Sequence, residues 1–213
     1  VNGETMWDAA DPATQRESEI RKKRLHFGLV FQNFNLFPQY TALQNVMLAG
    51  ELLAKERPDY RANKKAMHAQ LEQQARELLA QMGLSERADH YPHQLSGGQQ
   101  QRAALARILV GKPRILMLDE PFSALDSYLR EEVEGEVGSL LANFAGTALL
   151  VTHNRDEAYR LCKEMIVLNE GQVLRAGKTK EVFADPQSVA AARLTGCKNI
   201  LPCTRVGEHT VHL

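Results

Sequence analysis

The sequence is poor in cysteine, with only Cys162, Cys197 and Cys203 among its 213 residues. The number is odd, and none of the three belongs to a Cys-x-x-Cys pair. The sequence therefore predicts neither a disulfide framework nor a structural zinc site. This cysteine usage favours a reducing compartment.

An excess of one charge sign and long apolar runs are also lacking. Lys+Arg and Asp+Glu both number 26, and the formal net charge is +0, so no overall basic field indicates a nucleic-acid partner. One local basic run, 21–24 (RKKR), is most simply interpreted as a solvated turn. No apolar run approaches the ~20 residues that span a bilayer. With 44% hydrophobic and 24% charged residues, the composition is that of a globular chain holding one large domain or a domain with a subdomain.

Three short apolar runs contain the β-branched and aromatic residues that are typical of strands. They cover residues 26–31 (HFGLVF), 114–120 (RILMLDE) and 147–153 (TALLVTH). The middle run has four apolar residues in succession and predicts a strand that is buried on both faces. Further along, two apolar runs on either side of Asn169–Gln172 indicate a hairpin.

Helical spacing of apolar residues separates these predicted strands. It covers residue 41 to Gly83 around a polar connection, and it returns at 127–144 and after His153. Gly83 is a plausible helix stop. Because strands alternate with helices, the chain predicts a parallel α/β sheet, with an all-helical lobe at 41–110 between the first two strands.

Chemically useful side chains follow two of the predicted strands. Asp119 and Glu120 end the middle run, and ligands in open α/β sheets bind beyond the carboxyl ends of strands. An Asp at that place can hold Mg²⁺, and a Glu can activate a water. His153 ends the next run and can hydrogen-bond a phosphate or that water. The alternatives are a strand that simply ends in polar residues and a structural histidine.

The segment 95–99 (LSGGQ) places two glycines directly before a helical pattern. Gly97 and Gly98 lack a Cβ, so their N–H groups can approach an anion closely. The helix start adds unpaired N–H groups and the positive end of the helix dipole, and Ser96 adds a hydroxyl. The pattern predicts a phosphate-facing helix start; an ordinary capping turn is the alternative.

The order of these features along the chain resembles one family. Gln32 after the first strand, LSGGQ, the Ile115–Glu120 run, 123–126 (SALD) and His153 resemble the nucleotide-binding subunit of ATP-binding-cassette (ABC) transporters over nearly the whole chain. The resemblance implies an α/β fold: a P-loop NTPase (ABC ATPase) core with a parallel sheet and an inserted helical subdomain.

The same resemblance implies a role for each matching residue, with ATP and Mg²⁺ as cofactors. Glu120 would be the general base, His153 the switch histidine, and Gln32 the Q-loop residue that contacts the metal and senses a membrane partner. Asp119 would bind magnesium. The nucleotide held by an opposite subunit would be contacted by Ser96, Gly97, Gly98 and Gln99, with Asp126 at the dimer interface.

One motif of the family is missing from the sequence. No G-x-x-x-x-G-K-[ST] loop occurs, and the Gly-Lys pair at 111–112 is followed by proline. Residues 1–8 (VNGETMWD) resemble the segment that follows this loop and its helix. We therefore expect an N-terminally truncated cassette that binds ATP poorly and hydrolyses none by itself, although its full-length parent is an ATPase.

The resemblance also divides the chain into four segments. Residues 1–37 would be partial ATPase core with the Q-loop, 38–110 the helical subdomain, and 111–197 core with the Walker B, D-loop and switch histidine. Residues 198–213 would begin a β-rich accessory domain.

The importer type is suggested by three stretches. Residues 91–126 and 190–200 resemble molybdate and sulfate importers, whereas 31–46 resembles cassettes for polar amino acids. We expect an oxyanion importer, with a polar amino acid importer as the alternative. A soluble non-transport ABC ATPase and a decayed cassette that only binds or dimerises stay open as well.

The implied partners are a second ABC subunit and a transmembrane permease, with no nucleic acid. The subunit would be cytoplasmic and peripheral on the inner face of the cell membrane. A permease helix would dock near Gln32 on a groove at 33–48 that includes Phe34, Phe37 and Tyr40. For each single aromatic residue, simple core packing is the alternative.

Overall fold

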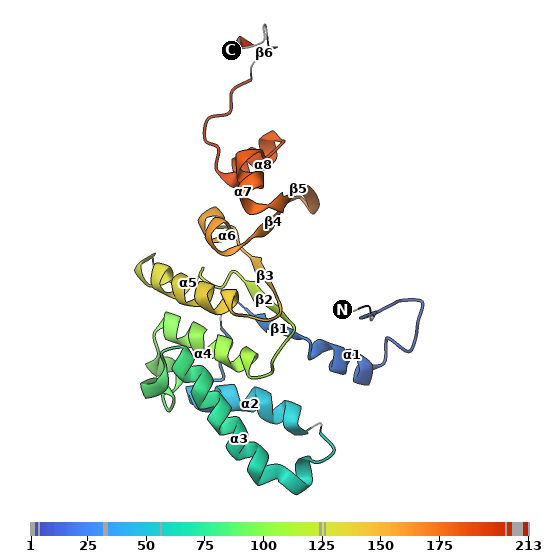
Figure 1. Ribbon diagram of the computed structural model, residues 1–213, viewed down its shortest axis with the longest axis vertical. Helices are drawn as coiled ribbons and strands as arrows, with labels where there is room; N and C mark the ends of the chain where they lie inside the picture. Colours follow the sequence, from blue (N-terminus) through green and yellow to red (C-terminus); the bar gives the residue numbers. More distant parts are fainter. Residues whose placement is uncertain are drawn as a thin grey trace. The chain divides into compact units, whose positions relative to one another are not determined.

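The computed structural model describes residues 3, 5–31, 34–55, 57–123, 125, 127–202, 204–205 and 211–212. Contacts divide the chain into two compact units, Val1–Val151 and Thr152–Leu213 (Figure 1). The division into four segments that end at residues 37, 110, 197 and 213 stays a prediction.

The first unit contains the predicted parallel sheet. Its strands are β1 (Phe27–Val30), β2 (Ile115–Asp119) and β3 (Thr147–Val151), in the order β1-β2-β3. All three predicted strands and their parallel pairing are confirmed.

Burial in this sheet differs from the expectation for the middle strand. On one face of β2, Leu116 and Leu118 are almost fully buried, whereas Ile115 and Met117 on the other face are only half-buried. The prediction of burial on both faces is therefore wrong for the described residues, because only the face that carries Leu116 and Leu118 packs into the core.

The helical lobe lies between β1 and β2 in the sequence, as predicted. It consists of α2 (Ala42–Lys55), α3 (Tyr60–Gln81), two 3₁₀ turns (Ser85–Arg87 and Pro92–Gln94) and α4 (Gly97–Leu109). Figure 1 shows α2, α3 and α4 packed beside one another. Their shared core contains fully buried apolar side chains, among them Val46, Leu79, Leu84 and Leu105.

Helix α3 ends at Gln81, just before the predicted helix stop at Gly83. Gly83 has a φ of 65°, a left-handed conformation that glycine adopts without a Cβ penalty. The N–H of Leu84 then donates to the carbonyl of Leu79 at 2.8 Å, which satisfies one of the last carbonyls of the helix. The buried Leu84 side chain returns the chain to the lobe core.

Two further helices belong to the first unit. Helix α1 (Glu17–Arg24) contains the basic run 21–24 in its last turn, so the interpretation of that run as a turn is wrong. Glutamates in its first turn and basic residues in its last turn both complement the helix dipole. Helix α5 (Ser127–Ala142) packs against α4 with Val133 and Val137 buried.

The second unit contains the predicted hairpin. Strands β4 (Glu164–Asn169) and β5 (Gln172–Lys178) pair antiparallel, and Asn169 lies opposite Gln172. Glu170 and Gly171 between them have φ values of 49° and 75°, which is the sign that a two-residue type I′ turn requires. The hairpin is confirmed.

Short helices surround this hairpin. They are the predicted α6 (Arg155–Leu161) and two helices that the sequence patterns did not indicate, α7 (Thr179–Ala184) and α8 (Val189–Thr195). Val167, Val182 and Ala191 form a small core between the hairpin, α7 and α8. A two-stranded ribbon, β6 (Thr204–Arg205) and β7 (Val211–His212), follows. Among the described residues, no helix is both long and apolar enough to cross a bilayer.

Candidate functional site

The chain bends sharply where β2 ends. Asp119 is the last residue of the strand, is exposed and pairs with Val151 of β3. Glu120 follows with a φ of 44°, a left-handed conformation that is unfavourable for a residue with a side chain. Its N–H donates to the carbonyl of Val151 at 2.9 Å, and its own carbonyl accepts from the amide and hydroxyl of Ser123. Such strain persists where surrounding bonds hold it, and it gathers at functional sites.

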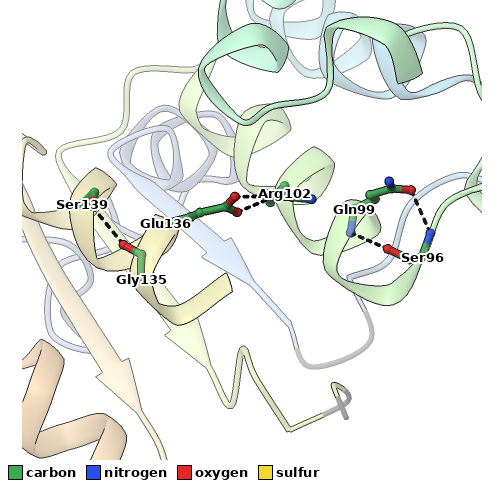
Figure 2. A network of polar contacts seen from close by, with 6 residues as sticks. All are labelled: Ser96, Gln99, Arg102, Gly135, Glu136 and Ser139. Carbon is green, nitrogen blue, oxygen red and sulfur yellow. Dashed lines mark hydrogen bonds and ion pairs between the residues drawn. The ribbon is translucent and has the colours of Figure 1, made fainter. Parts of the chain in front are cut away.

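The start of α4 is closed by a capping box, which Figure 2 shows. The amide of Gln99 donates to Oγ of Ser96 at 3.4 Å, and the amide of Ser96 donates to Oε1 of Gln99 at 3.0 Å. The predicted helix start is confirmed, and so is the capping turn that was the alternative. The two are compatible, because Ser96 Oγ accepts in this cap and its hydrogen is not used by it.

Both glycines of this helix start lie close to other parts of the first unit. A Cβ on Gly98 would lie 2.9 Å from Cγ2 of Val133 on α5, and a Cβ on Gly97 would lie 3.3 Å from Cδ2 of Leu125. The glycines thus allow α4 to approach α5 and the Leu125 turn closely. The two glycines therefore have a packing role in the structure, and their approach to an anion stays a prediction.

An ion pair also joins α4 to α5. Nη1 of Arg102 lies 2.6 and 2.5 Å from the two carboxylate oxygens of Glu136 (Figure 2). On α5 itself, the hydroxyl of Ser139 donates to the carbonyl of Gly135. Arg102 and Glu136 are 34 residues apart in the sequence, so no spacing pattern could predict their pairing. The ion pair adds a polar contact between α5 and the helix that LSGGQ begins.

In the second unit, His153 lies in a turn that a buried carboxylate organises. Glu157 is 3% exposed and accepts from Oγ1 of Thr152 at 2.5 Å and from Nδ2 of Asn154 at 3.0 Å. Asn154 also caps α6 by accepting from the amide of Asp156. Exposed His153 lies between these two anchored residues, and Glu157 is a residue that sequence reasoning missed.

Two of the predicted site residues, Gln32 and Asp126, lie outside the described residues. Asp119, Glu120 and residues 96–99 belong to the first unit, and His153 to the second. The roles given to all of these residues stay predictions.

The aromatic residues of the predicted docking groove differ in burial. Phe34 is 6% exposed and belongs to the core, as the alternative interpretation had it, whereas Phe37 is 42% exposed. Phe37 and Tyr40 meet edge to face at 6.0 Å. Buried Asn45 of α2 fixes their loop, because its amide group accepts from the N–H of Phe37 and donates to the carbonyls of Phe37, Tyr40 and Thr41.

A second Gly-Lys pair, followed by Thr179, lies at the junction of β5 and α7 in the second unit. It is preceded by Gly171, but five residues separate the two glycines instead of four. Thr179 is buried, and its hydroxyl donates to the carbonyl of Cys162 at 2.7 Å, while Lys178 pairs with Glu181. These contacts make the junction a packed connection rather than a phosphate loop.

A groove of about 1140 Å³ lies at the opposite, amino-terminal end of the sheet in the first unit. Its lining includes Met82 of the lobe, Arg114 and Phe144. None of the predicted site residues lines it.

At the carboxyl end of β2, the described residues offer one exposed carboxylate, that of Asp119, as a ligand for magnesium. Mg²⁺ usually takes one or two carboxylates and completes its shell with waters and substrate phosphates. Exposed Asp119 at the carboxyl end of β2 is such a carboxylate. Within the described part of the chain, no three His, Cys, Asp or Glu side chains gather as a metal site of their own, and a nucleotide-supported Mg²⁺ needs no such cluster.

Comparison with known proteins identifies the family. The ABC transporter family model matches residues 1–123. The chain is 40% identical over 87% of its length to the L-cystine transport system ATP-binding protein TcyN of Escherichia coli (strain K12), and 39% identical over 85% to the sulfate/thiosulfate import ATP-binding protein CysA 2 of Chromobacterium violaceum. The solved structure of cbiO1 from Clostridium perfringens, part of the ABC transporter complex cbiONQ, superposes with a TM-score of 0.67 at 28% identity over 81% of the chain.

The chain therefore belongs to the ABC transporter family, and its α/β fold with a parallel sheet is that of an ABC ATPase. The resemblance inferred from the motifs is confirmed at this level. The chain spans 70% of the cystine relative, 46% of the sulfate relative and 64% of the solved chain. The activity, substrates and partners of a whole protein are therefore matters of proposal.

Proposed function

We propose that this chain is the ATP-binding subunit of a bacterial ABC importer and works in ATP-driven solute uptake. The observation that carries the proposal is the strained bend at Glu120, directly after exposed Asp119 at the carboxyl end of β2. Two consecutive acidic residues thus lie at the carboxyl end of β2, and the carboxyl ends of strands are where open α/β sheets bind ligands. The glycine-containing start of α4 supports the same reading, because it offers first-turn N–H groups to an anion.

Each residue of the site has one proposed task. Asp119 would hold Mg²⁺, which supplies charge neutralisation for the phosphates when it is bound, and Gln32 would contact the same ion. Glu120 accepts the proton of the water that attacks the terminal phosphate. Exposed His153 donates a hydrogen bond to that phosphate.

The start of α4 serves a nucleotide held by a second ABC subunit. Ser96 donates its hydroxyl hydrogen, the amides of Gly97 and Gly98 donate from the first helical turn, and Gln99 keeps the turn closed. Asp126 lies at the interface of the two subunits in this proposal.

The phosphate cradle of such a dimer comes from a G-x-x-x-x-G-K-[ST] loop, which the 213 residues do not contain. Two copies of this chain would offer two LSGGQ segments and no cradle. We therefore propose that this chain by itself binds MgATP weakly and does not turn it over, and that a chain carrying the loop is an ATPase. MgATP turnover by the purified 213-residue protein would contradict this part of the proposal.

The proposed solute is an inorganic oxyanion such as molybdate or sulfate, with a polar amino acid as the second candidate. The sulfate relative, at 39% identity, supports the first, and the cystine relative, at 40%, supports the second. Uptake of radiolabelled sulfate, molybdate and cystine by cells with and without the gene distinguishes them. Equal uptake of all three in both strains would contradict both candidates.

The proposed partners are a second ABC subunit and a transmembrane permease, which would hold the protein on the inner, cytoplasmic face of the cell membrane. Exposed Phe37 on the loop fixed by Asn45 is the proposed contact for the permease. Co-purification with a polytopic membrane protein is expected. A chain that remains alone in detergent extracts would instead favour a soluble ABC ATPase.

The decisive test of the catalytic assignment is Glu120→Gln in a chain that also carries a G-x-x-x-x-G-K-[ST] loop. Loss of the general base should lower ATP turnover by about 10²- to 10⁴-fold while MgATP binding persists. Glu131→Gln, at an exposed position of α5, is the matched control and should leave turnover unchanged. Equal turnover in both variants would rule out Glu120 as the base.

A further inference from the structure

Arg107, near the end of α4, makes contacts that the proposed function leaves unused. Its Nη1 donates to the carbonyl of Asn35 at 2.6 Å, and its Nη2 donates to the carbonyl of Phe34 at 3.1 Å. Two consecutive main-chain carbonyls thus converge on one guanidinium. The planar fork of arginine suits this arrangement, because its two terminal nitrogens point the same way at a fixed separation.

The turn that Arg107 holds is strained. Phe34 and Asn35 have φ values of 56° and 48°, and two non-glycine residues in succession rarely adopt the left-handed region. Asn tolerates this region, but Phe does so poorly. The strained pair must therefore be held by its surroundings, and the guanidinium that binds both carbonyls does so directly.

The charge of Arg107 has no other evident task. Burial lowers the pKa of its guanidinium, so the protein bears a desolvation cost to keep a cation at this place. Among the described residues, no carboxylate forms a salt bridge with Arg107. The carbonyl dipoles of the turn are its hydrogen-bond acceptors.

The turn leads into the exposed aromatic loop. In the loop 34–40, Arg107 of α4 binds the carbonyls of Phe34 and Asn35, and Asn45 of α2 binds the backbone of Phe37 and Tyr40. The side chain of Phe37 is exposed. Arg107 belongs to the same continuous helix as Gly97, about 15 Å along its axis at 1.5 Å per residue. One rigid element therefore joins the LSGGQ segment to the aromatic loop.

We infer that Arg107 is a positioning residue that fixes the 34–40 loop to the helix carrying LSGGQ, so that a displacement of that helix moves the loop with it. This inference rests on the proposed function for its consequence, since the loop is the proposed permease contact. The mechanical link itself is a property of the chain alone. Movement of the nucleotide-facing helix start would thus reach the permease through one guanidinium.

The link is tested by hydrogen–deuterium exchange on the 213-residue protein. The amides of Phe34, Phe37 and Tyr40 are hydrogen-bonded and report on the loop. Arg107→Gln should raise their exchange rates by at least about tenfold, since one hydrogen bond from a charged donor corresponds to roughly that factor in an opening equilibrium. Exchange in α2, α3 and α4 should stay within about twofold.

Two further variants sharpen the result. Arg107→Lys keeps the charge but loses the fork, and we expect an intermediate exchange rate in the loop. Arg76→Gln removes an exposed ion pair with Glu72 on α3 and should change nothing at 34–40. Unchanged loop exchange in Arg107→Gln, or an equal rise throughout α2 and α4, would overturn the inference, because the first denies the link and the second indicates general support of the fold.

The consequence is tested separately in membranes that contain the complete importer. Arg107→Gln should leave ATP turnover within about threefold of the parent and lower the solute imported per ATP by about tenfold, as expected for the loss of one charged hydrogen bond or more. An equal loss of ATP turnover and of solute imported per ATP would contradict a positioning role. If the complete importer without the substitution neither hydrolyses ATP nor imports solute, the proposed function fails. The exchange experiment on the 213-residue protein still shows whether Arg107 holds the 34–40 loop on α4.

Discussion

Substituting Gly98 by alanine tests how closely α4 and α5 approach each other. The added Cβ would lie 2.9 Å from Cγ2 of Val133, whereas carbon atoms in contact prefer about 3.5–4.0 Å. Val133 is 2% exposed, and as a β-branched residue in a helix it has essentially one accessible χ1 rotamer. The helices must therefore separate, and overpacking of this kind costs about 1–3 kcal/mol.

The chain offers a matched control at Gly135 on α5. A Cβ there would meet nothing within 4 Å, so alanine should stabilise the helix by about 0.5–1 kcal/mol through propensity alone. Thermal unfolding of both variants, followed by far-UV circular dichroism, should separate them by several degrees, at about 2–4 °C per kcal/mol for a chain of this size. If Gly98→Ala were as stable as Gly135→Ala, the close approach of α4 to α5 would be refuted.

Three other outcomes are expected from single side chains. Asn45→Ala should lower stability by about 1–3 kcal/mol, because the Phe37 amide loses its acceptor and the Tyr40 carbonyl loses its donor, while the carbonyls of Phe37 and Thr41 each lose one of two donors; a urea midpoint equal to that of the parent would contradict this. Glu157→Ala should increase amide exchange around the His153 turn, since the Thr152 and Asn154 donors lose their acceptor, and unchanged exchange would argue against that anchor. Burial raises the pKa of the Cys162 thiol and also restricts access to it, whereas Cys197 is exposed. Iodoacetamide at pH 8 should therefore label Cys197 first, with peptide mass spectrometry as the readout and faster labelling of Cys162 as the contrary result.

The elements that could be predicted from the sequence are those with a strong local pattern. The three parallel strands are short apolar runs, α3 ends at a glycine with positive φ, and the β4–β5 hairpin contains Glu170-Gly171 in its turn. The LSGGQ helix start combines a capping box with glycines, and both signals are local. These patterns act within a few residues and need no knowledge of the tertiary fold.

The parts that could not be predicted depend on distant contacts. Gln101 lies in a run of three glutamines and looks like a surface residue, yet it faces the packed side of α4 and is completely buried. Arg107 and Asn35 are 72 residues apart, and Arg102 and Glu136 are 34 apart; only the packing of α4 against its neighbours brings each pair together. Helix α8 has seven residues, too few for a periodic pattern to stand out.

The capping box at Ser96 and Gln99 has a consequence for recognition. Because the two residues bond to each other's backbone amides, the first turn of α4 holds its shape without any ligand. A preorganised donor set loses little conformational entropy when an anion arrives. The helix start can therefore act as a ready-made surface, and the speed of its encounter with an anion is limited by approach and orientation rather than by local folding.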